Sequence, residues 1–363
     1  MTTLDCVKTS QFDEVDRQLL HALVVSPRAS FRLLAEVVGV SDQTVARRYR
    51  RMTQVAGLRV LGIINGERAG WVDWLVRIQA TPGSAQRIAD TLAARPDTRW
   101  VRLFSGGTEI ACTLQARTPE QRNTVFLQGL PGSRHVTGIA AHSILHVFTP
   151  VAWGGYASTL TDGQLSLLTD AAGDIDLRET GAAREASARE ASAREVGPAT
   201  GVALRGDDDP LIAELARDGR APVAALAAAT HWHESTVRRR IDELQQAGLL
   251  YFDLDVDDAL LGINVTVMLW LSVEPAHLEA AGRAVAAHPE VPFAAATTGP
   301  TNLAVSAVFR DTRQVYAYLT TKLAGIPGLR SVESAPIIGT LKRTGTRDLA
   351  RAAPQEDVPR AAG

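Results

Sequence analysis

Residues 23–52 read LVVSPRASFRLLAEVVGVSDQTVARRYRRM, and residues 215–244, LARDGRAPVAALAAATHWHESTVRRRIDEL, align with them without a gap. Both stretches hold two short helical patterns separated by a turn, and the second pattern of each is rich in arginine. Self-similarity between such distant segments indicates that the chain is built from two copies of one unit. The repeat therefore predicts a tandem architecture.

The first copy has the caps and the turn of a helix-turn-helix module. Asp13 can cap a first helix, and Ser30 can cap a short second one. Gly39 supplies the turn that follows, and Ser41 caps a third helix. A short second helix, a glycine-containing turn and a third helix are typical of DNA-binding modules. We place this module at residues 12–65.

The third helix of the first copy has two chemically different faces. Val45, Tyr49 and Met52 recur at helical spacing and are predicted to face the core. Arginine and glutamine on the other face match guanine and adenine edges in the major groove, and a capped helix start suits phosphates. The alternative is a solvated helix face without a ligand. The residues predicted to contact DNA here are Ser30, Ser41, Gln43, Thr44, Arg47, Arg48 and Arg51.

The second copy, placed at residues 207–257, repeats the pattern with a more balanced charge. Glu234, Asp242 and Glu243 offset its arginines, so we predict a weaker phosphate binder. Pro210 fits a helix only in the first turn, which leaves the first helix of this copy less clearly defined.

Two histidines beside the third helix of the second copy invite a metal-binding interpretation. His231 and His233 have no cysteine and no third ligand at suitable spacing, so we predict neither a metal nor a cofactor. His233 stands where the first copy has Ser41, which favours a capping or DNA-contacting role. The residues predicted to contact DNA in this copy are His233, Ser235, Thr236, Arg238 and Arg239.

After each helix-turn-helix, a strand-like stretch predicts a wing, and the order strand, helix, strand, strand, helix, strand follows. This βαββαβ order predicts an α+β fold with a ferredoxin-like sheet that carries both helices on one face. We place these modules at residues 71–150 and 263–345. The other face of each sheet needs a cover, so we predict an internal pseudo-dimer that associates further into a homo-oligomer.

Residues 173–206 separate the two copies and contain the repeated letters AAREASAREASAREV. Too few large apolar residues are present to form a core, so this segment is predicted to be a linker. A partner-binding tail is the alternative that this composition leaves open.

Composition limits the classes of function. The formal net charge of -2 excludes a DNA packager with an overall basic field, so DNA binding must be local. Cys6 and Cys112 are the only cysteines, which favours a reducing compartment. With no apolar run of about 20 residues, we expect a cytoplasmic protein without a membrane partner. No nucleophile–base pair or phosphate-cradling loop stands out, so we predict no enzyme.

The SDQTVARRYRRM and HESTVRRRIDEL helices, the LPGSRHV and IPGLRSV segments and the SGGTEI and TGPTNL turns resemble the Lrp/AsnC family of transcription regulators. Its αβ module is the RAM domain, related to ACT domains. The resemblance covers nearly everything except the linker and the termini, and implies a fusion of two family members. It further implies binding of double-stranded DNA and a response to a small-molecule effector such as an amino acid.

The resemblance places the effector near the two glycine turns, where glycine lets the backbone approach a ligand closely. Glu109 is the candidate to receive an ammonium group, whereas the second copy has the neutral Asn302. Ordinary hairpin turns are the alternative. The residues predicted to bind the effector are Gly106, Gly107, Glu109, Gly299 and Asn302.

Two other functions share this pattern. Siroheme decarboxylases resemble the same family and also occur as fused pairs, but they do not need a basic recognition helix. A bound tetrapyrrole would show itself by its absorbance. A sensor module with reduced DNA binding is the third interpretation, and the second copy fits it best. A DNA footprint by residues 207–363 alone would show that the second copy binds DNA and would argue against the sensor interpretation.

Overall fold

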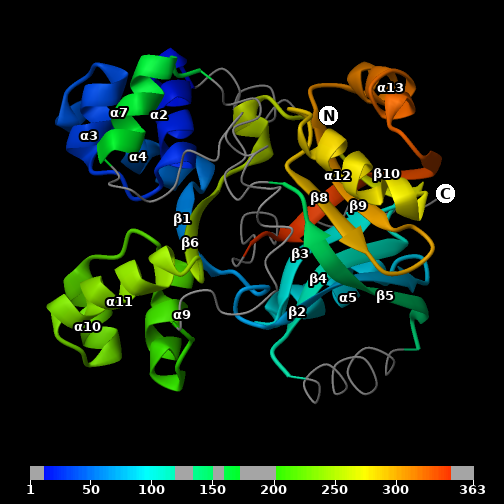
Figure 1. Ribbon diagram of the computed structural model, residues 1–363, viewed down its shortest axis with the longest axis horizontal. Coiled ribbons are helices and arrows are strands. Elements are labelled where there is room, and N and C mark those ends of the chain that lie inside the picture. The colour runs from blue at the N-terminus through cyan, green and yellow to red at the C-terminus, as the bar shows by residue number, and fades with distance from the viewer. Residues whose placement is uncertain (1–11, 119–133, 150–158, 172–201, 345–363) are drawn as a thin grey trace, which may run out of the picture.

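The computed structural model describes residues 12–118, 134–149, 159–171 and 202–344. Figure 1 shows two helical modules on one side, joined by a two-stranded ribbon, and a strand-rich body on the other. Most of the predicted linker, and the second helix expected in the first αβ module, lie outside the described residues. The described residues show the helix-turn-helix twice, the complete βαββαβ order in the second copy, and the same order in the first copy apart from that second helix.

The first helix-turn-helix consists of α2 (Glu14–Val25), α3 (Phe31–Val38) and α4 (Asp42–Ala56). The predicted caps are present: Asp13 accepts from the Asp16 amide, Ser30 from Leu33 and Ser41 from Thr44. Gly39 has a φ of 76°, which is the left-handed conformation that the turn requires. The core side chains that these helices bury include Leu19, Leu20, Leu23, Leu34, Val45 and Met52.

A helix that the sequence did not predict completes this module. α7 (Asp162–Ala171) packs on α2 and α3, and Leu160 and Leu168 enter their apolar core. The imidazole Nδ1 of His21 accepts hydrogen bonds from the amides of Thr159 and Leu160, at 3.0 Å each. Burial lowers the pKa of His21, which favours the neutral ring that can accept these bonds.

The second helix-turn-helix begins with the short η4 (Gly206–Asp208), followed by α9 (Asp209–Arg217), α10 (Val223–Thr230) and α11 (Glu234–Gln246). Pro210 lies in the first turn of α9, as predicted. His231 takes the left-handed conformation, with a φ of 59°, where the first copy has glycine. The second module therefore repeats the first, but its turn holds a residue for which the left-handed conformation is energetically less favourable than it is for glycine.

The strands that follow the two helix-turn-helix modules pair with each other. β1 (Arg59–Ile64) and β6 (Leu250–Asp255) run antiparallel, with Arg59 opposite Asp255 and Ile64 opposite Leu250. The first residue of each strand thus faces the last residue of the other, as a two-fold axis requires. Where the sequence predicted a wing in each copy, the two copies share one ribbon, because each strand finds its hydrogen-bond partner in the other copy.

The two αβ modules close into one eight-stranded barrel with the order β10-β3-β4-β2-β5-β8-β9-β7. Each module contributes a ferredoxin-like sheet, and pairing of β5 with β8 and of β10 with β3 joins the two sheets. The elements of the first module are β2 (Val72–Ala80), α5 (Ala85–Ala94), β3 (Thr98–Phe104), β4 (Glu109–Ala116) and β5 (Val136–Val147). Those of the second are η5 (Asp258–Leu261), β7 (Val265–Val273), η6 (Pro275–His277), α12 (Leu278–Ala286), β8 (Phe293–Thr297), β9 (Leu303–Phe309), α13 (Thr312–Thr320), η7 (Leu323–Gly325) and β10 (Leu329–Lys342).

The inner faces of the two sheets pack on each other. Phe104 of the first module and Trp270 of the second meet at 5.7 Å between ring centroids. Leu75 and Met268 belong to the same buried cluster. The two copies thus cover each other's sheets, which confirms the predicted internal pseudo-dimer. Among the described residues, no helix is long and apolar enough to cross a membrane.

Candidate nucleic-acid interface and effector site

The outward face of α4 carries a row of polar side chains. Gln43, Arg47, Arg50 and Gln54 recur at helical spacing, and all four are exposed. Neither Arg47 nor Arg50 forms an ion pair with any residue that the structure describes. At the start of the same helix, the Ser41 hydroxyl accepts from the Thr44 amide at 3.2 Å. The Nε of Arg50 donates to the Ala46 carbonyl at 3.2 Å. The face therefore offers guanidinium groups that form no ion pair in the described part of the chain, beside an ordered helix N-terminus.

Arg48 and Arg51 point elsewhere, toward a buried carboxylate on α2. Asp16 is fully buried, and Arg48 Nη1 lies 2.9 Å from its Oδ1 and 2.7 Å from Oδ1 of Asp13. Arg51 forms an ion pair with the same aspartate. Burial acts to raise the pKa of Asp13, but the hydrogen bonds from Arg48 prevail and lower it. Arg48 therefore braces α4 against α2, and its predicted contact with DNA stays a prediction.

The same brace recurs in the second copy, where all three arginines of α11 are paired. Arg240 contacts the fully buried Asp208 at 2.6 Å and Glu243 at 3.1 Å. Arg238 pairs with Glu234 at 3.1 Å, and Arg239 pairs with Glu243 at 3.3 Å. Arg238 and Arg239 are nevertheless mostly exposed, so these two pairs are weak and can be exchanged for a ligand.

His233 occupies the N-cap of α11, but its side chain makes no capping hydrogen bond. Of the two roles that the sequence left open, contact with DNA stays a prediction. Ser235 is exposed and Thr236 is half-buried in the first turn of α11. Asp242 stands exposed at the place that Arg50 takes in the first copy. The second head therefore presents an acidic group where the first presents a basic one.

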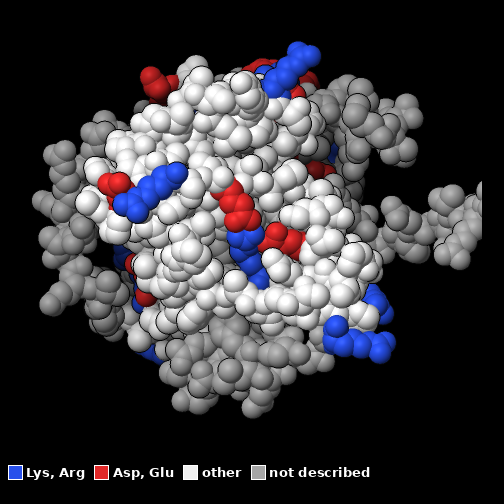
Figure 2. All heavy atoms as spheres, turned by 90° about the vertical axis from the view of Figure 1, so that its right-hand side faces the viewer, with Lys and Arg blue, Asp and Glu red and all other residues white. Residues whose placement is uncertain are grey.

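The face of the barrel that points away from the two heads differs from α4. Figure 2 shows it as mostly uncharged surface, on which several basic and acidic groups lie side by side. Basic side chains do not gather into a field on the described part of this face. A uniform attraction for phosphates is therefore absent there, and the heads remain the candidate DNA-binding surface.

The turn between β3 and β4 holds Glu109 in an ion cluster between the two modules. The Nε of Arg77 lies 2.6 Å from Glu109 Oε1, and the same guanidinium contacts Glu333 of β10 at 2.6 Å. It also lies 3.8 Å above the ring of Trp270. Ser105 donates to the second oxygen of Glu109 at 3.2 Å. An ammonium group would have to compete with Arg77, so the effector role of Glu109 stays a prediction.

The corresponding turn of the second copy is built differently. The Asn302 amide accepts from the Val273 amide and donates to its carbonyl, both at 2.9 Å. A Cβ atom on Gly299 would lie 2.3 Å from Nδ1 of His142, so only glycine fits at this place. Gly106 and Gly107 of the first turn have positive φ; the space beside Gly106 is open, and a Cβ atom on Gly107 would lie at ordinary contact distance, 3.9 Å, from Cδ1 of Ile338. The two predicted effector turns are therefore unequal.

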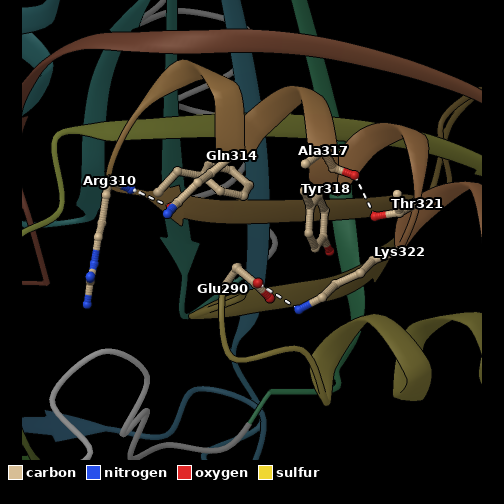
Figure 3. Close-up of a pocket in the computed structure, with 8 residues that line it drawn as sticks. Glu290, Arg310, Gln314, Ala317, Tyr318, Thr321 and Lys322 are labelled. Carbon is tan, nitrogen blue, oxygen red and sulfur yellow. Dashed lines mark hydrogen bonds and ion pairs between the residues drawn. The ribbon is translucent and has the colours of Figure 1, made fainter.

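A pocket of about 400 Å³ opens beside α13 in the second αβ module (Figure 3). An ion pair of 2.7 Å between Lys322 Nζ and Glu290 Oε1 lies at this pocket, and Oε2 of Glu290 is buried without a hydrogen-bond partner among the described residues. Tyr318 forms a 3.0 Å hydrogen bond with His288, and burial raises its pKa. Sequence reasoning missed this pocket, because Glu290 lies apart in the sequence from the other lining residues, which fall within residues 309–322.

Comparison with protein families identifies both helix-turn-helix modules and the second αβ module. The AsnC-type helix-turn-helix domain matches residues 12–53 and 208–245, and the Lrp/AsnC ligand binding domain matches residues 266–347. An uncharacterized HTH-type transcriptional regulator of Pyrococcus abyssi is 26% identical over 139 residues, which cover 38% of this chain and 87% of the relative. The HTH-type transcriptional regulator FL11 of Pyrococcus horikoshii is 25% identical over 138 residues, which cover 38% of this chain and 91% of that protein.

One solved structure matches both copies at once. The siroheme decarboxylase NirDL has a TM-score of 0.56 and 12% sequence identity, and the match covers 91% of this chain and 93% of that chain. At this identity the likeness shows a shared fold alone. It supports the whole tandem arrangement of two helix-turn-helix modules on one αβ body.

Proposed function

This chain belongs to the Lrp/AsnC family, with the AsnC-type helix-turn-helix present twice, and we propose that it regulates transcription by sequence-specific DNA binding led by its first head. The observation that carries the proposal is the pair Arg47 and Arg50, exposed on the outward face of α4 and without an ion-pair partner in the described residues. Such guanidinium groups can donate to base edges and phosphates without breaking an ion pair, and the hydrogen bond of Arg50 from Nε to the Ala46 carbonyl, at 3.2 Å, leaves its terminal nitrogens available.

The proposed contacts divide by their position along α4. Gln43 and Arg47, near the start, are suited to base edges, because the N-terminal residues of a recognition helix reach the floor of the major groove. Arg50 and Gln54, one and two turns further on, are suited to the phosphates of the groove wall. In the second copy, Arg238 and Arg239 must first leave Glu234 and Glu243, so this head adds less affinity.

A small-molecule effector is the second part of the proposal. The matched ligand binding domain supports effector binding by the αβ body, and an amino acid or related metabolite is the class that we propose. The effector would act by binding one arrangement of the chain more tightly than another. The two glycine turns and the pocket beside α13 are the candidate places.

The test is DNA selection with the intact chain, followed by affinity measurements on the selected site. Arg47→Ala and Arg50→Ala should each weaken binding, by about 1–3 kcal/mol where the arginine reads a base. Affinity should also fall steeply with salt, because phosphate contacts release counterions. Arg87→Ala on α5 is the matched control, since Arg87 is exposed on the barrel. If both head variants bind as tightly as the control, α4 is not the reading helix.

A decarboxylase acting on siroheme is the alternative that the fold shares with NirDL. The exposed arginines of α4 support the regulator, because a purely enzymatic chain has no use for them. Purified protein that shows the visible absorbance of a tetrapyrrole, or takes one up on addition, would favour the alternative. The DNA measurement decides between the two independently.

A further inference from the structure

The turn between α9 and α10 of the second head reaches into the first head. Arg220 donates from Nη1 to the Pro27 carbonyl at 2.7 Å and from Nη2 to the Ala29 carbonyl at 2.8 Å. Both acceptors lie in the loop between α2 and α3. The two donors of one planar guanidinium thus hold two carbonyls of the other module, a geometry that the single ammonium of lysine cannot reproduce.

Two aromatic rings of the first head complete the binding place of Arg220. Its guanidinium carbon lies 5.1 Å from the ring centroid of Phe31 and 5.3 Å from that of Tyr49. The two rings contact each other with centroids 5.4 Å apart. Since Tyr49 belongs to α4 itself, Arg220 of the second head touches the recognition helix of the first.

The backbone presents Arg220 at a fixed place. The Gly219 amide donates to the Val60 carbonyl of the ribbon at 2.7 Å, and a Cβ atom on Gly219 would lie 2.9 Å from Val60 Cγ1. Asp218 accepts from the Arg220 amide at 2.8 Å. The arginine therefore starts from a turn that is packed on the ribbon, and the two heads are joined at the ribbon and at Arg220.

The equivalent residue of the first copy does not form the same contact. Arg28 lies 4.8 Å from the ring of Phe252 in β6 of the other copy, and its Nη1 is buried without a hydrogen-bond partner in the described part of the chain. Where the first head has Phe31 and Tyr49, the second has Val223 and Ile241. We call the carbonyl and ring contacts of Arg220 the clamp; within the described residues, Arg28 matches it by a single ring contact, without the two carbonyls.

We propose that Arg220 is a positioning residue that fixes the orientation of the two reading heads and thereby sets the half-site spacing that the chain accepts on DNA. This inference rests on the proposed function. Two recognition helices reach successive major grooves only when their separation matches about one helical turn, roughly 34–36 Å, or a multiple of it. A ribbon of two strands alone twists easily, so a second attachment is needed to hold that separation.

The clamp can be tested without DNA, by the distance between spin labels at Glu36→Cys on α3 and Ala228→Cys on α10. These positions are equivalent in the repeat and both exposed. Cys6→Ser and Cys112→Ala remove the native thiols. The parent should give one narrow distance distribution. Arg220→Ala and Arg220→Lys should broaden it, and Arg28→Ala should leave it narrow. Arg220→Lys keeps the charge but cannot hold both carbonyls, so it tests the clamp even where the alanine variant fails to fold.

The DNA part uses the selected operator with 5 or 10 base pairs inserted between its half-sites. The parent should lose about tenfold or more in affinity on the 5-base-pair insertion, which turns one half-site to the opposite face of the duplex. Arg220→Lys should reduce this loss to about twofold, because freed heads can each find their groove. An unchanged distance distribution in both Arg220 variants refutes the clamp. Absence of any DNA binding by the parent refutes the proposed function instead, and leaves the distance result standing.

Discussion

The two recognition helices are held in the same way and present different surfaces. In each head a buried aspartate at the start of the first helix binds an arginine of the third: Asp16 in α2 binds Arg48, and Asp208, the N-cap of α9, binds Arg240. On the outward face, however, Arg50 of α4 is replaced by Asp242 of α11. The repeat thus keeps the contacts that hold a head together and varies those that it can offer to a ligand.

The largest effect is expected from breaking the two braces. Asp208→Asn leaves the almost fully buried Arg240 with only the partly exposed Glu243 as a carboxylate partner, and breaking such a buried pair typically costs about 3–5 kcal/mol. Asp16→Asn should cost less, because Arg48 keeps Asp13 and Arg51 is partly exposed. The free energy of unfolding from urea titrations measures both. Equal losses in the free energy of unfolding would contradict the expected difference between the two braces.

The Asp208 brace also has a pH signature. Burial acts to raise the pKa of Asp208, but the hydrogen bonds from Arg240 prevail and hold it below the ordinary value of 3.8. Its contribution to stability is therefore present above pH 3.8 and is lost as the pH falls toward the lowered value. The difference between the parent and Asp208→Asn should shrink in that range.

A reciprocal exchange tests the outward faces. Asp242→Arg gives α11 the charge of α4, and Arg50→Asp does the opposite. If both heads approach phosphates, the first variant should steepen the dependence of affinity on salt by about one unit of slope, and the second should flatten it by a similar amount. Affinity at several salt concentrations on one operator measures this. If the salt dependence changes in Arg50→Asp but not in Asp242→Arg, only the first head contacts DNA.

The sequence predicts what depends on local spacing. The caps Asp13, Ser30 and Ser41 were identified because the serine or aspartate stands directly before a helical pattern. Arg48 was predicted to contact DNA, and its ion pair with Asp16 could not be foreseen, because Asp16 lies on another helix and helical periodicity does not reveal such pairs. A side chain at the edge of the exposed face turns toward a buried carboxylate rather than toward solvent.

Two parts of the fold depend on partners that no local pattern reveals. A strand pattern does not name the strand with which it pairs, so a wing was expected where β1 and β6 form a shared ribbon. α7 was missed because a short helix with few buried residues resembles connecting chain. Its signal was Thr161 before a helical run, where the threonine hydroxyl contacts Gln164 in the first turn.

A smaller effect is expected at the ribbon, where the two strands differ in charge. Burial raises the pKa of Asp253 to about 7, whereas its equivalent in β1 is Gly62. The folded state then binds a proton that the unfolded state has lost, so stability should decline between pH 3.8 and about 7. Asp253→Asn should remove this decline, and Asp242→Asn, on an exposed site, should not. Thermal unfolding measures it, at about 2–4 °C for each kcal/mol.

The smallest effect concerns the effector, because any ligand must compete with contacts already made. Titration calorimetry with a panel of amino acids and related acids should find a binder for the parent chain. Glu109→Gln removes the charge that would receive an ammonium group, and should weaken binding by about tenfold if that charge-assisted hydrogen bond forms. Glu290→Gln is the matched change at the pocket beside α13, where Oε2 of Glu290 has no partner among the described residues. A loss confined to Glu109→Gln places the effector at the β3–β4 turn, and a loss confined to Glu290→Gln places it at the pocket. A binder whose affinity neither change alters would exclude both carboxylates, and the assignment of the DNA-binding heads would stand unchanged.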